Sequence, residues 1–210
     1  LSRLLFNFCN DTLSAVYLFG VKDRLYCDAP DSARRKRTQT AIYRIVSGLI
    51  RLLGPICPHS ADEAWRALHN VDNKSDLCVH TETFPSLTGC SAIPVSGDWS
   101  AMMSLRDQVM KKLETERKTL GVDNPLDLGV IAPTPVGVEV AAFEPADLAD
   151  LCGVSRFAFA PGSGNSDPIT VTDLRDQPAC ERSWKRDGTV KARSDGGMLS
   201  NRDAAALGLA

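Results

Sequence analysis

Apolar residues recur every three or four positions along four stretches in the first 120 residues of the chain. This period places apolar side chains on one face of an α-helix, so the pattern predicts four helices. The first starts at Leu1, and the second covers about 32–53 and is ended by Pro55, because proline cannot continue the helical hydrogen bonds. The third begins near Ser60 and the fourth at Asp98. We therefore expect the chain to open with a bundle of helices.

Details at the helix starts refine this expectation. The segment Ser60-Ala61-Asp62-Glu63 has the sequence of a capping box, in which a hydroxyl and a carboxylate bind free amides at the start of a helix. Trp65 and Trp99 fall on apolar helix faces, which predicts that both indoles are buried. Leu1 is not Met and lies inside a helical pattern without a cap before it. We therefore expect the chain to be truncated at its N-terminus.

The pattern changes after Gly121 from the helical period to short apolar runs. The runs at 126–131 and 156–159 predict strands, and 144–151 predicts a helix between them. Asp187-Gly188 is a turn signal that predicts a hairpin in the last part of the chain. A mainly α-helical bundle is thus expected over 1–120, a small α+β unit over 121–165, and a short ribbon-like tail that ends in a helix over 166–210.

Composition agrees with a globular protein. Hydrophobic residues make up 43% and charged residues 24% of the 210 residues, and the net charge is −2. The longest apolar runs are only a few residues, so we expect no membrane partner and a cytoplasmic location. The seven cysteines are scattered and odd in number, which favours reduced thiols over a disulfide framework.

Four consecutive cations, Arg34-Arg35-Lys36-Arg37, lie at the start of the second predicted helix. Cations near a helix N-terminus oppose the helix dipole, at a cost of some tenths of a kcal/mol each. An anionic partner such as a phosphate backbone would relieve this cost. A plain solvated helix face is the alternative interpretation of the same run.

The tail contains the spacing of a zinc ribbon without its thiols. A structural zinc site of two C-x-x-C pairs needs four thiolates, and here the four places are Cys180, Ser183, Ser200 and Asp203. We therefore expect no zinc. Either the ribbon persists without metal through the packing of Trp184 with other apolar residues, which the turn signal favours, or the tail is loosely ordered.

Several short blocks resemble the C-terminal part of bacterial isoleucyl-tRNA synthetases, in the same order and over nearly the whole chain. The tail frame is similar to their C-terminal zinc module, since Trp184 follows the first pair directly and an Arg lies inside both pairs. The blocks that resemble the anticodon-binding helical domain are Asn7-Phe8-Cys9-Asn10-Asp11, Val21-Lys22-Asp23-Arg24-Leu25-Tyr26, Arg34-Arg35 with Gln39-Thr40-Ala41, Leu52-Leu53-Gly54-Pro55-Ile56-Cys57-Pro58-His59, and Ala61-Asp62-Glu63-Ala64-Trp65. The family's next helix is similar to Trp99 with Leu105-Arg106, Val109, Lys112-Leu113-Glu114 and Arg117, and the Asn124-Pro125-Leu126-Asp127 turn follows in the right order.

The resemblance implies an enzyme that ligates isoleucine to tRNA(Ile) with ATP and Mg, through a catalytic core and an inserted editing domain. The two ATP-binding signatures of that core, H-I-G-H and K-M-S-K-S, are absent from the sequence. The chain alone is therefore expected to be catalytically inactive and to need no cofactor. The resemblance further implies a monomer that binds the anticodon arm, while the rest of the same enzyme performs the chemistry.

Recognition of anticodon bases calls for cations and for flat side chains on which bases stack. The candidate tRNA-binding residues are Arg34, Arg35, Arg37, Lys111, Arg117 and Lys118 for phosphates, and Arg182, Trp184 and Lys185 for bases.

Three alternative functions stay open: a free-standing RNA-binding or adaptor module, the same domain of the valine or leucine enzyme, and a structural domain that shares only bundle patterning.

Overall fold

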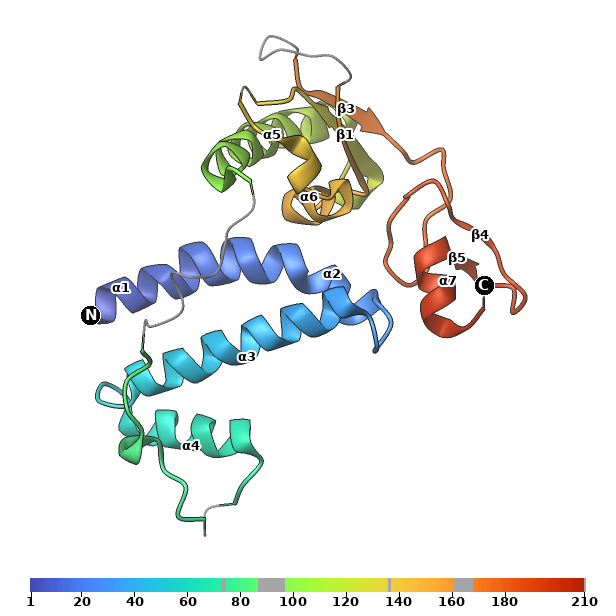
Figure 1. The fold of residues 1–210 in the computed structure, drawn as a ribbon. Helices are drawn as coiled ribbons and strands as arrows, with labels where there is room; N and C mark the ends of the chain where they lie inside the picture. Colours follow the sequence, from blue (N-terminus) through green and yellow to red (C-terminus); the bar gives the residue numbers. More distant parts are fainter. Residues whose placement is uncertain (73–74, 87–96, 136, 161–167, 210) are drawn as a thin grey trace. The chain divides into compact units, whose positions relative to one another are not determined.

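The computed structural model describes residues 1–72, 75–86, 97–135, 137–160 and 168–209. Its contacts form two compact units (Figure 1). Unit 1 contains residues 1–5 and 36–95, and unit 2 contains residues 6–35 and 96–210. This grouping differs from the expected boundary at residue 120, and the expected boundary at residue 165 lies outside the described residues.

The first helix is continuous from Ser2 to Cys27 and comprises α1 (Ser2–Asn7), a π-helical stretch η1 (Phe8–Leu18) and α2 (Phe19–Cys27). With a mean hydropathy of 1.3, it is long and apolar enough to cross a membrane by length and composition. Core helices of soluble proteins pass the same test, so this is weak evidence. The short apolar runs of the sequence thus combine into one helix of this length, and the absence of a membrane partner stays a prediction.

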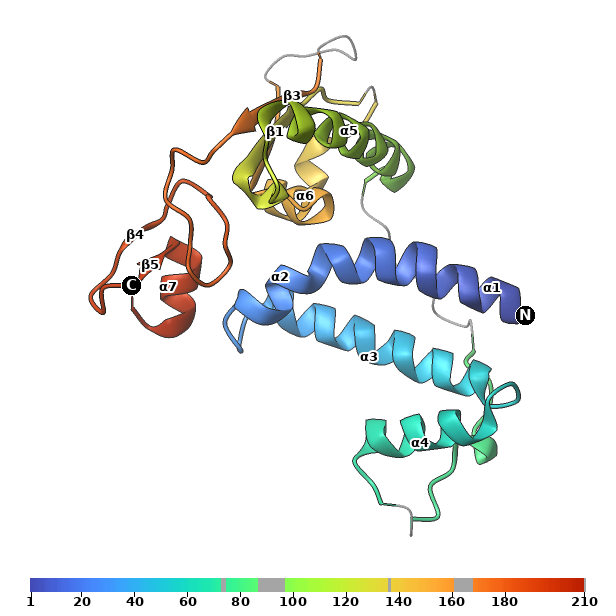
Figure 2. The same ribbon diagram turned by 180° about the vertical axis from the view of Figure 1, so that it is seen from behind.

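Unit 1 is built on two helices and a short 3-10 turn. Helix α3 (Ala33–Leu53) agrees with the predicted range of 32–53, and α4 (Pro58–His69) lies beside it in both views (Figure 2). The 3-10 turn η2 (Val79–Thr81) packs against both helices. Trp65 is buried, as predicted. The buried apolar cluster of this unit consists of Ile50, Ala61, Trp65 and Val79.

The predicted capping box at the start of α4 is wrong. The helix begins at Pro58, so Ser60 lies inside its first turn rather than before it. Proline has a fixed φ that suits the first helical position, so the helix starts two residues earlier in the sequence than predicted. The Asp62 carboxylate instead accepts a hydrogen bond from Arg66 Nε at 2.8 Å and one from the backbone N–H of Val79 at 3.2 Å.

The sheet of unit 2 has β1 (Leu128–Ala132) at its centre. Strand β2 (Arg156–Phe159) is parallel to β1, and β3 (Thr170–Asp173) is antiparallel to it on the other side. Helix α6 (Pro145–Cys152) connects β1 to β2, as a parallel connection requires. Two 3-10 turns, η3 (Pro125–Asp127) and η4 (Val140–Ala142), complete this region. The predicted order of strand, helix and strand is confirmed.

Helix α5 (Trp99–Leu120) belongs to the core of this α+β fold. Its cap is Asp98, whose carboxylate accepts a hydrogen bond from the backbone N–H of Ala101 at 3.0 Å. Trp99 is 45% exposed and contacts Phe143 edge-on, so the prediction that its indole is buried is wrong. The indole stands at the first helical position, before the part of the face that meets the sheet. That face buries Met102, Leu105, Val109 and Leu113 against the sheet and α6.

The tail of unit 2 contains a two-stranded sheet of β4 (Lys191–Ala192) and β5 (Met198–Leu199), followed by α7 (Asn201–Leu207). The predicted final helix is confirmed. The hairpin turn lies between these strands, where the Arg193 N–H donates to the Gly197 carbonyl at 3.0 Å. Asp187-Gly188 is therefore not the hairpin turn. Its aspartate instead accepts the backbone N–H of Thr189 at 2.8 Å.

Candidate nucleic-acid interface

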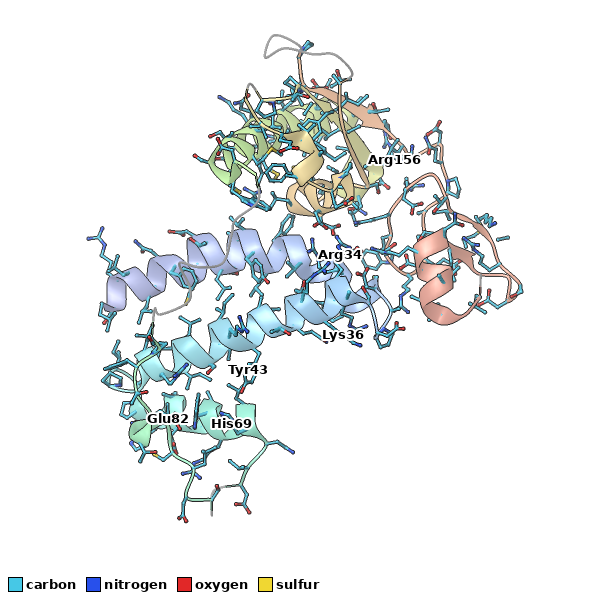
Figure 3. All side chains as sticks on the ribbon, in the orientation of Figure 1. Arg34, Lys36, Tyr43, His69, Glu82 and Arg156 are labelled. Carbon is cyan, nitrogen blue, oxygen red and sulfur yellow. The ribbon has the colours of Figure 1, made fainter. Side chains whose placement is uncertain are left out.

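Two of the predicted RNA ligands, Arg34 and Lys185, are held inside unit 2 by the same carboxylate. The Asp150 side chain is only 2% exposed. Its Oδ2 accepts a hydrogen bond from Arg34 Nη2 at 2.7 Å, and its Oδ1 accepts one from Lys185 Nζ. Lys185 also contacts Asp23 of α2 at 3.4 Å. Figure 3 shows Arg34 at the start of α3, where this cluster forms.

The charge environment of Arg34 fits this internal role. Burial alone would lower the pKa of its guanidinium, but the carboxylates of Asp147 and Asp150 reverse the effect and raise it. Arg35 is engaged as well, because its Nη1 donates to the backbone carbonyl of Asp28 at 2.8 Å. Both arginines thus hold the start of α3 in place, and a phosphate contact from either would need these bonds to open.

The remaining predicted phosphate ligands differ in how far they are engaged. Arg117 Nε donates to the Val122 carbonyl at 3.2 Å and closes the C-terminal end of α5. Lys118 forms an exposed ion pair with Glu114 at 3.5 Å, which costs little to open. Arg37 on α3 and Lys111 on α5 are exposed. Arg37, Lys111 and Lys118 are therefore the predicted cations best placed to meet an RNA backbone.

Trp184 is the most exposed of the predicted base-contacting residues. Its side chain is 66% exposed and its φ is 61°, in the left-handed region that non-glycine residues rarely adopt. Two backbone hydrogen bonds impose this conformation: Cys180 N–H donates to the Lys185 carbonyl at 2.8 Å, and Trp184 N–H donates to the Cys180 carbonyl at 2.8 Å. Strained backbone of this kind concentrates at functional sites. The loop therefore presents the indole to solvent, and the prediction that Trp184 packs within the ribbon is wrong.

A cavity of about 510 Å³ lies beside this indole. The α2 helix contributes aromatic side chains to its wall, and of these Tyr26 is 70% and Phe19 is 44% exposed. Arg182 links the two walls, because its Nη2 donates to the Tyr26 carbonyl at 3.0 Å. The side chains around the cavity that suit a nucleic acid are Phe19, Lys22, Tyr26, Asn124, Arg182 and Trp184.

Sequence reasoning missed Phe19, Tyr26 and Asn124 as lining residues. Phe19 falls within the first predicted helix, and Tyr26 and Asn124 belong to blocks that carry the family resemblance. The sequence signal that could have identified Tyr26 is its position as an aromatic residue directly before Cys27, where the helix ends. Only the folded chain brings it close to Trp184, which is more than 150 positions away. Open aromatic faces beside a lysine suit base stacking with phosphate contact.

The four zinc-frame positions meet in the structure, but their chemistry does not fit zinc. Asp203 Oδ2 accepts hydrogen bonds from Cys180 Sγ at 3.0 Å, Ser183 Oγ at 2.7 Å and Ser200 Oγ at 3.0 Å. Structural zinc is bound by thiolates and imidazoles, and this frame offers one thiol. Among the described residues, no group of three or more His, Cys, Asp or Glu side chains could hold a metal ion.

Residues 1–132 match the family model of the anticodon-binding domain of tRNA ligases. The chain belongs to this family. The matched residues contain all the helices from α1 to α5 and the first strand of the sheet, β1. The anticodon-binding domain that the residue blocks resemble is thus the one that the comparison finds.

Relatives of this anticodon-binding domain are isoleucine–tRNA ligases, so the family is that of aminoacyl-tRNA synthetases. The chain is 34% identical over 184 residues to the enzyme of Brevibacillus brevis, with 84% of the chain and 20% of the relative covered. It is 32% identical to that of Streptococcus agalactiae, covering 96% and 22%, and 30% identical to that of Burkholderia mallei, covering 93% and 20%. The chain thus spans about a fifth of the length of these relatives.

Proposed function

We propose that this chain binds the anticodon arm of tRNA(Ile) as the tRNA-binding part of an isoleucine–tRNA ligase. The whole enzyme would ligate isoleucine to tRNA in the cytoplasm, as a monomer, with ATP and Mg bound by its catalytic domain. The partners of this chain would be tRNA(Ile) and the catalytic and editing domains of the same enzyme. The chain itself would contribute binding and orientation rather than chemistry, and would hold no zinc.

The exposed indole of Trp184 carries this proposal. The Trp184 side chain is 66% exposed and its φ is 61°, so most of the indole is open to a ligand. Its neighbours at the cavity, Tyr26 and Lys22, are also exposed. Splayed single-stranded bases stack on such faces, and each stacked base contributes about 1–3 kcal/mol. The family of the chain supports the anticodon loop as the single strand concerned.

Exposed cations on the helices support the same function. Arg37 and Lys111 are exposed, and Lys118 is held only by a surface ion pair. Each phosphate that such a cation neutralises releases counterions, so binding weakens as salt rises. These contacts would position the RNA stem, whereas the cavity beside Trp184 would read the loop.

A titration with RNA hairpins tests the proposal. One hairpin carries the anticodon stem and loop of tRNA(Ile), and a second has the same stem with an unrelated loop of equal length. We expect the first to bind more tightly at every salt concentration, and both to weaken as salt rises. Anticodon hairpins of tRNA(Val) and tRNA(Leu) test the related enzymes. Equal binding of all the loops, or no complex in dilute buffer, would contradict the proposal.

A further inference from the structure

The place that zinc would take in a ribbon contains a buried carboxylate. Asp203 is fully buried, and a single oxygen, Oδ2, accepts three hydrogen bonds from the other frame positions. Cys180 and Ser183 bring the first loop to this oxygen, and Ser200 brings the start of α7. One atom thus joins the two halves of the ribbon, as a metal ion does in a thiolate site.

We infer that the Asp203 carboxylate replaces zinc as the centre of this ribbon and acts as a positioning residue for Trp184. Ser183, which donates to Asp203, is the residue directly before Trp184 in the strained loop. Cys180, the other donor of this loop, supplies the carbonyl that accepts the Trp184 N–H at 2.8 Å. Fixing both donors on one oxygen therefore fixes the turn that exposes the indole. As far as it concerns RNA, the inference rests on the proposed function.

The start of α7 shows how the second thiol pair was replaced without loss of order. Ser200 is the N-cap residue, and its Oγ accepts the backbone N–H of Asp203 at 3.1 Å while donating to the Asp203 carboxylate at 3.0 Å. The spacing Ser-x-x-Asp is that of a capping box, with a carboxylate at the third helical position. Ser200 and Asp203, which stand at the second pair of thiol positions, thus cap the helix and also complete the hydrogen-bonded frame.

The charge of this buried carboxylate is balanced. Its Oδ1 contacts Arg202 Nη2 at 3.1 Å and Arg182 Nε at 3.9 Å. Arg202 also pairs with Asp23 and approaches Asp28 at 3.6 Å, so the frame is joined to the end of α2. Burial alone would raise the pKa of Asp203, but the bonds from Cys180 and Ser183 and the charge of Arg202 lower it below its ordinary value. The group is therefore ionised at neutral pH.

The first experiment separates positioning from folding with a double-mutant cycle in the 210-residue chain. Asp203→Asn removes the charge and leaves one acceptor oxygen for three donors. We expect it to weaken binding of the tRNA(Ile) anticodon hairpin about fivefold or more, as the loss of a stacking face would. In a Trp184→Ala background the same change should have no further effect on affinity, although it still lowers Tm.

The control for this cycle is Asp176→Asn, which removes the charge of an exposed aspartate in the same unit and should change neither affinity nor Tm. A full effect of Asp203→Asn on affinity in the Trp184→Ala background would overturn the positioning role. An Asp203→Asn protein with wild-type affinity and an unchanged NMR signal of the Trp184 indole N–H would overturn it as well.

The second experiment restores the metal site. The triple variant Ser183→Cys, Ser200→Cys, Asp203→Cys completes four thiols with Cys180, and we expect it to bind about one zinc per chain. Zinc should return its Trp184 indole signal to the wild-type position, and a chelator should remove this effect. The wild-type chain should be insensitive to the chelator. Stoichiometric zinc in the wild-type chain, or a zinc-loaded triple variant with a displaced indole signal, would overturn the replacement.

The two readouts distinguish this inference from the proposed function. The indole signal and the metal content need no RNA, so they test the frame even if no hairpin binds. If the wild-type chain fails to bind the anticodon hairpin while zinc still restores the indole signal of the triple variant, the proposed function is wrong and the frame is right. If hairpins bind and the Trp184 indole signal is unchanged in the Asp203→Asn variant, the inference that Asp203 positions Trp184 is wrong.

Discussion

Two regions of unit 2 are held together by opposite means. The α+β core packs apolar side chains such as Val109, Leu128 and Val154, each fully buried. The junction between α2, α6 and the tail instead gathers charges, here called the tail ion cluster: Asp150, Lys185 and Asp203 are buried, and Asp23 and Arg202 are half-buried. The apolar core should tolerate substitutions that keep the volume and polarity of a side chain. In the tail ion cluster, each substitution leaves an oppositely charged group without its partner.

Removal of Asp150 should be the most damaging single change. Asp150→Ala leaves Arg34 and Lys185 without the carboxylate that both contact, and breaking a buried ion pair costs about 3–5 kcal/mol. Urea unfolding of the variant and the wild type measures the difference. Asp176→Asn on the surface is the control. A loss below about 1 kcal/mol would mean that the tail ion cluster is not a buried network.

Truncation in the apolar core should come next. Leu128→Ala removes a side chain with no exposed area from the centre of the sheet, at a cost of about 2–5 kcal/mol in the free energy of unfolding. Ile131→Ala on the same strand is the matched control, because Ile131 is 41% exposed and should cost much less. Addition of salt should leave the Leu128→Ala difference unchanged and alter that of Asp150→Ala. Equal costs at positions 128 and 131 would contradict the assigned strand faces.

Replacement of the exposed indole should affect binding rather than stability. Trp184→Ala should weaken binding of the tRNA(Ile) hairpin by about 1–3 kcal/mol for each base that stacks on it. The unfolding free energy should change by less than about 0.5 kcal/mol, since the side chain is 66% exposed. Trp184→Phe retains a flat face and should recover most of the affinity. Fluorescence anisotropy of a labelled hairpin gives both values, and an Ala variant with full affinity would argue against stacking.

The ion pair of unit 1 should show the smallest effect, confined to acid. The hydrogen bond from Arg66 lowers the pKa of Asp62 to about 2. A carboxyl with a depressed folded-state pKa contributes stability above its ordinary pKa of 3.8, and this stability is lost as pH falls toward 2. NMR titration of the Asp62 carboxyl carbon measures the midpoint. Arg66→Gln should move it back toward 3.8, and an unchanged midpoint would exclude Arg66 as the cause.

The difference between the regions also explains what could be predicted from the sequence. Helix α3, the order of β1, α6 and β2, and the burial of Trp65 follow from apolar periodicity, because each element buries one face. Charged clusters have no such period. The pairing of Asp150 with Arg34 and Lys185 joins residues far apart in the sequence, so the two cations were assigned to RNA. The exposure of Trp99 and the Pro58 start of α4 depend on local geometry at helix ends, where patterns are least informative.

The four frame positions show the same limit. The loss of three of the four thiols predicts that zinc is absent, and the predicted helix at the end of the tail is confirmed. The convergence of three donors on Asp203 Oδ2 could not be predicted, because a serine and an aspartate at thiol positions are equally compatible with a loosely ordered tail. The cavity beside Trp184 was missed for a related reason, since its second wall comes from α2.

A ribbon centred on a carboxylate has a physiological consequence. Modules built on four thiolates depend on the supply of zinc and lose it when oxidants attack their sulfur ligands. Here the frame keeps one sulfur, that of Cys180, which is fully buried. Starvation for the metal or an oxidative burst would leave this ribbon folded, whereas ribbons that depend on thiolate-bound zinc would lose their metal and unfold.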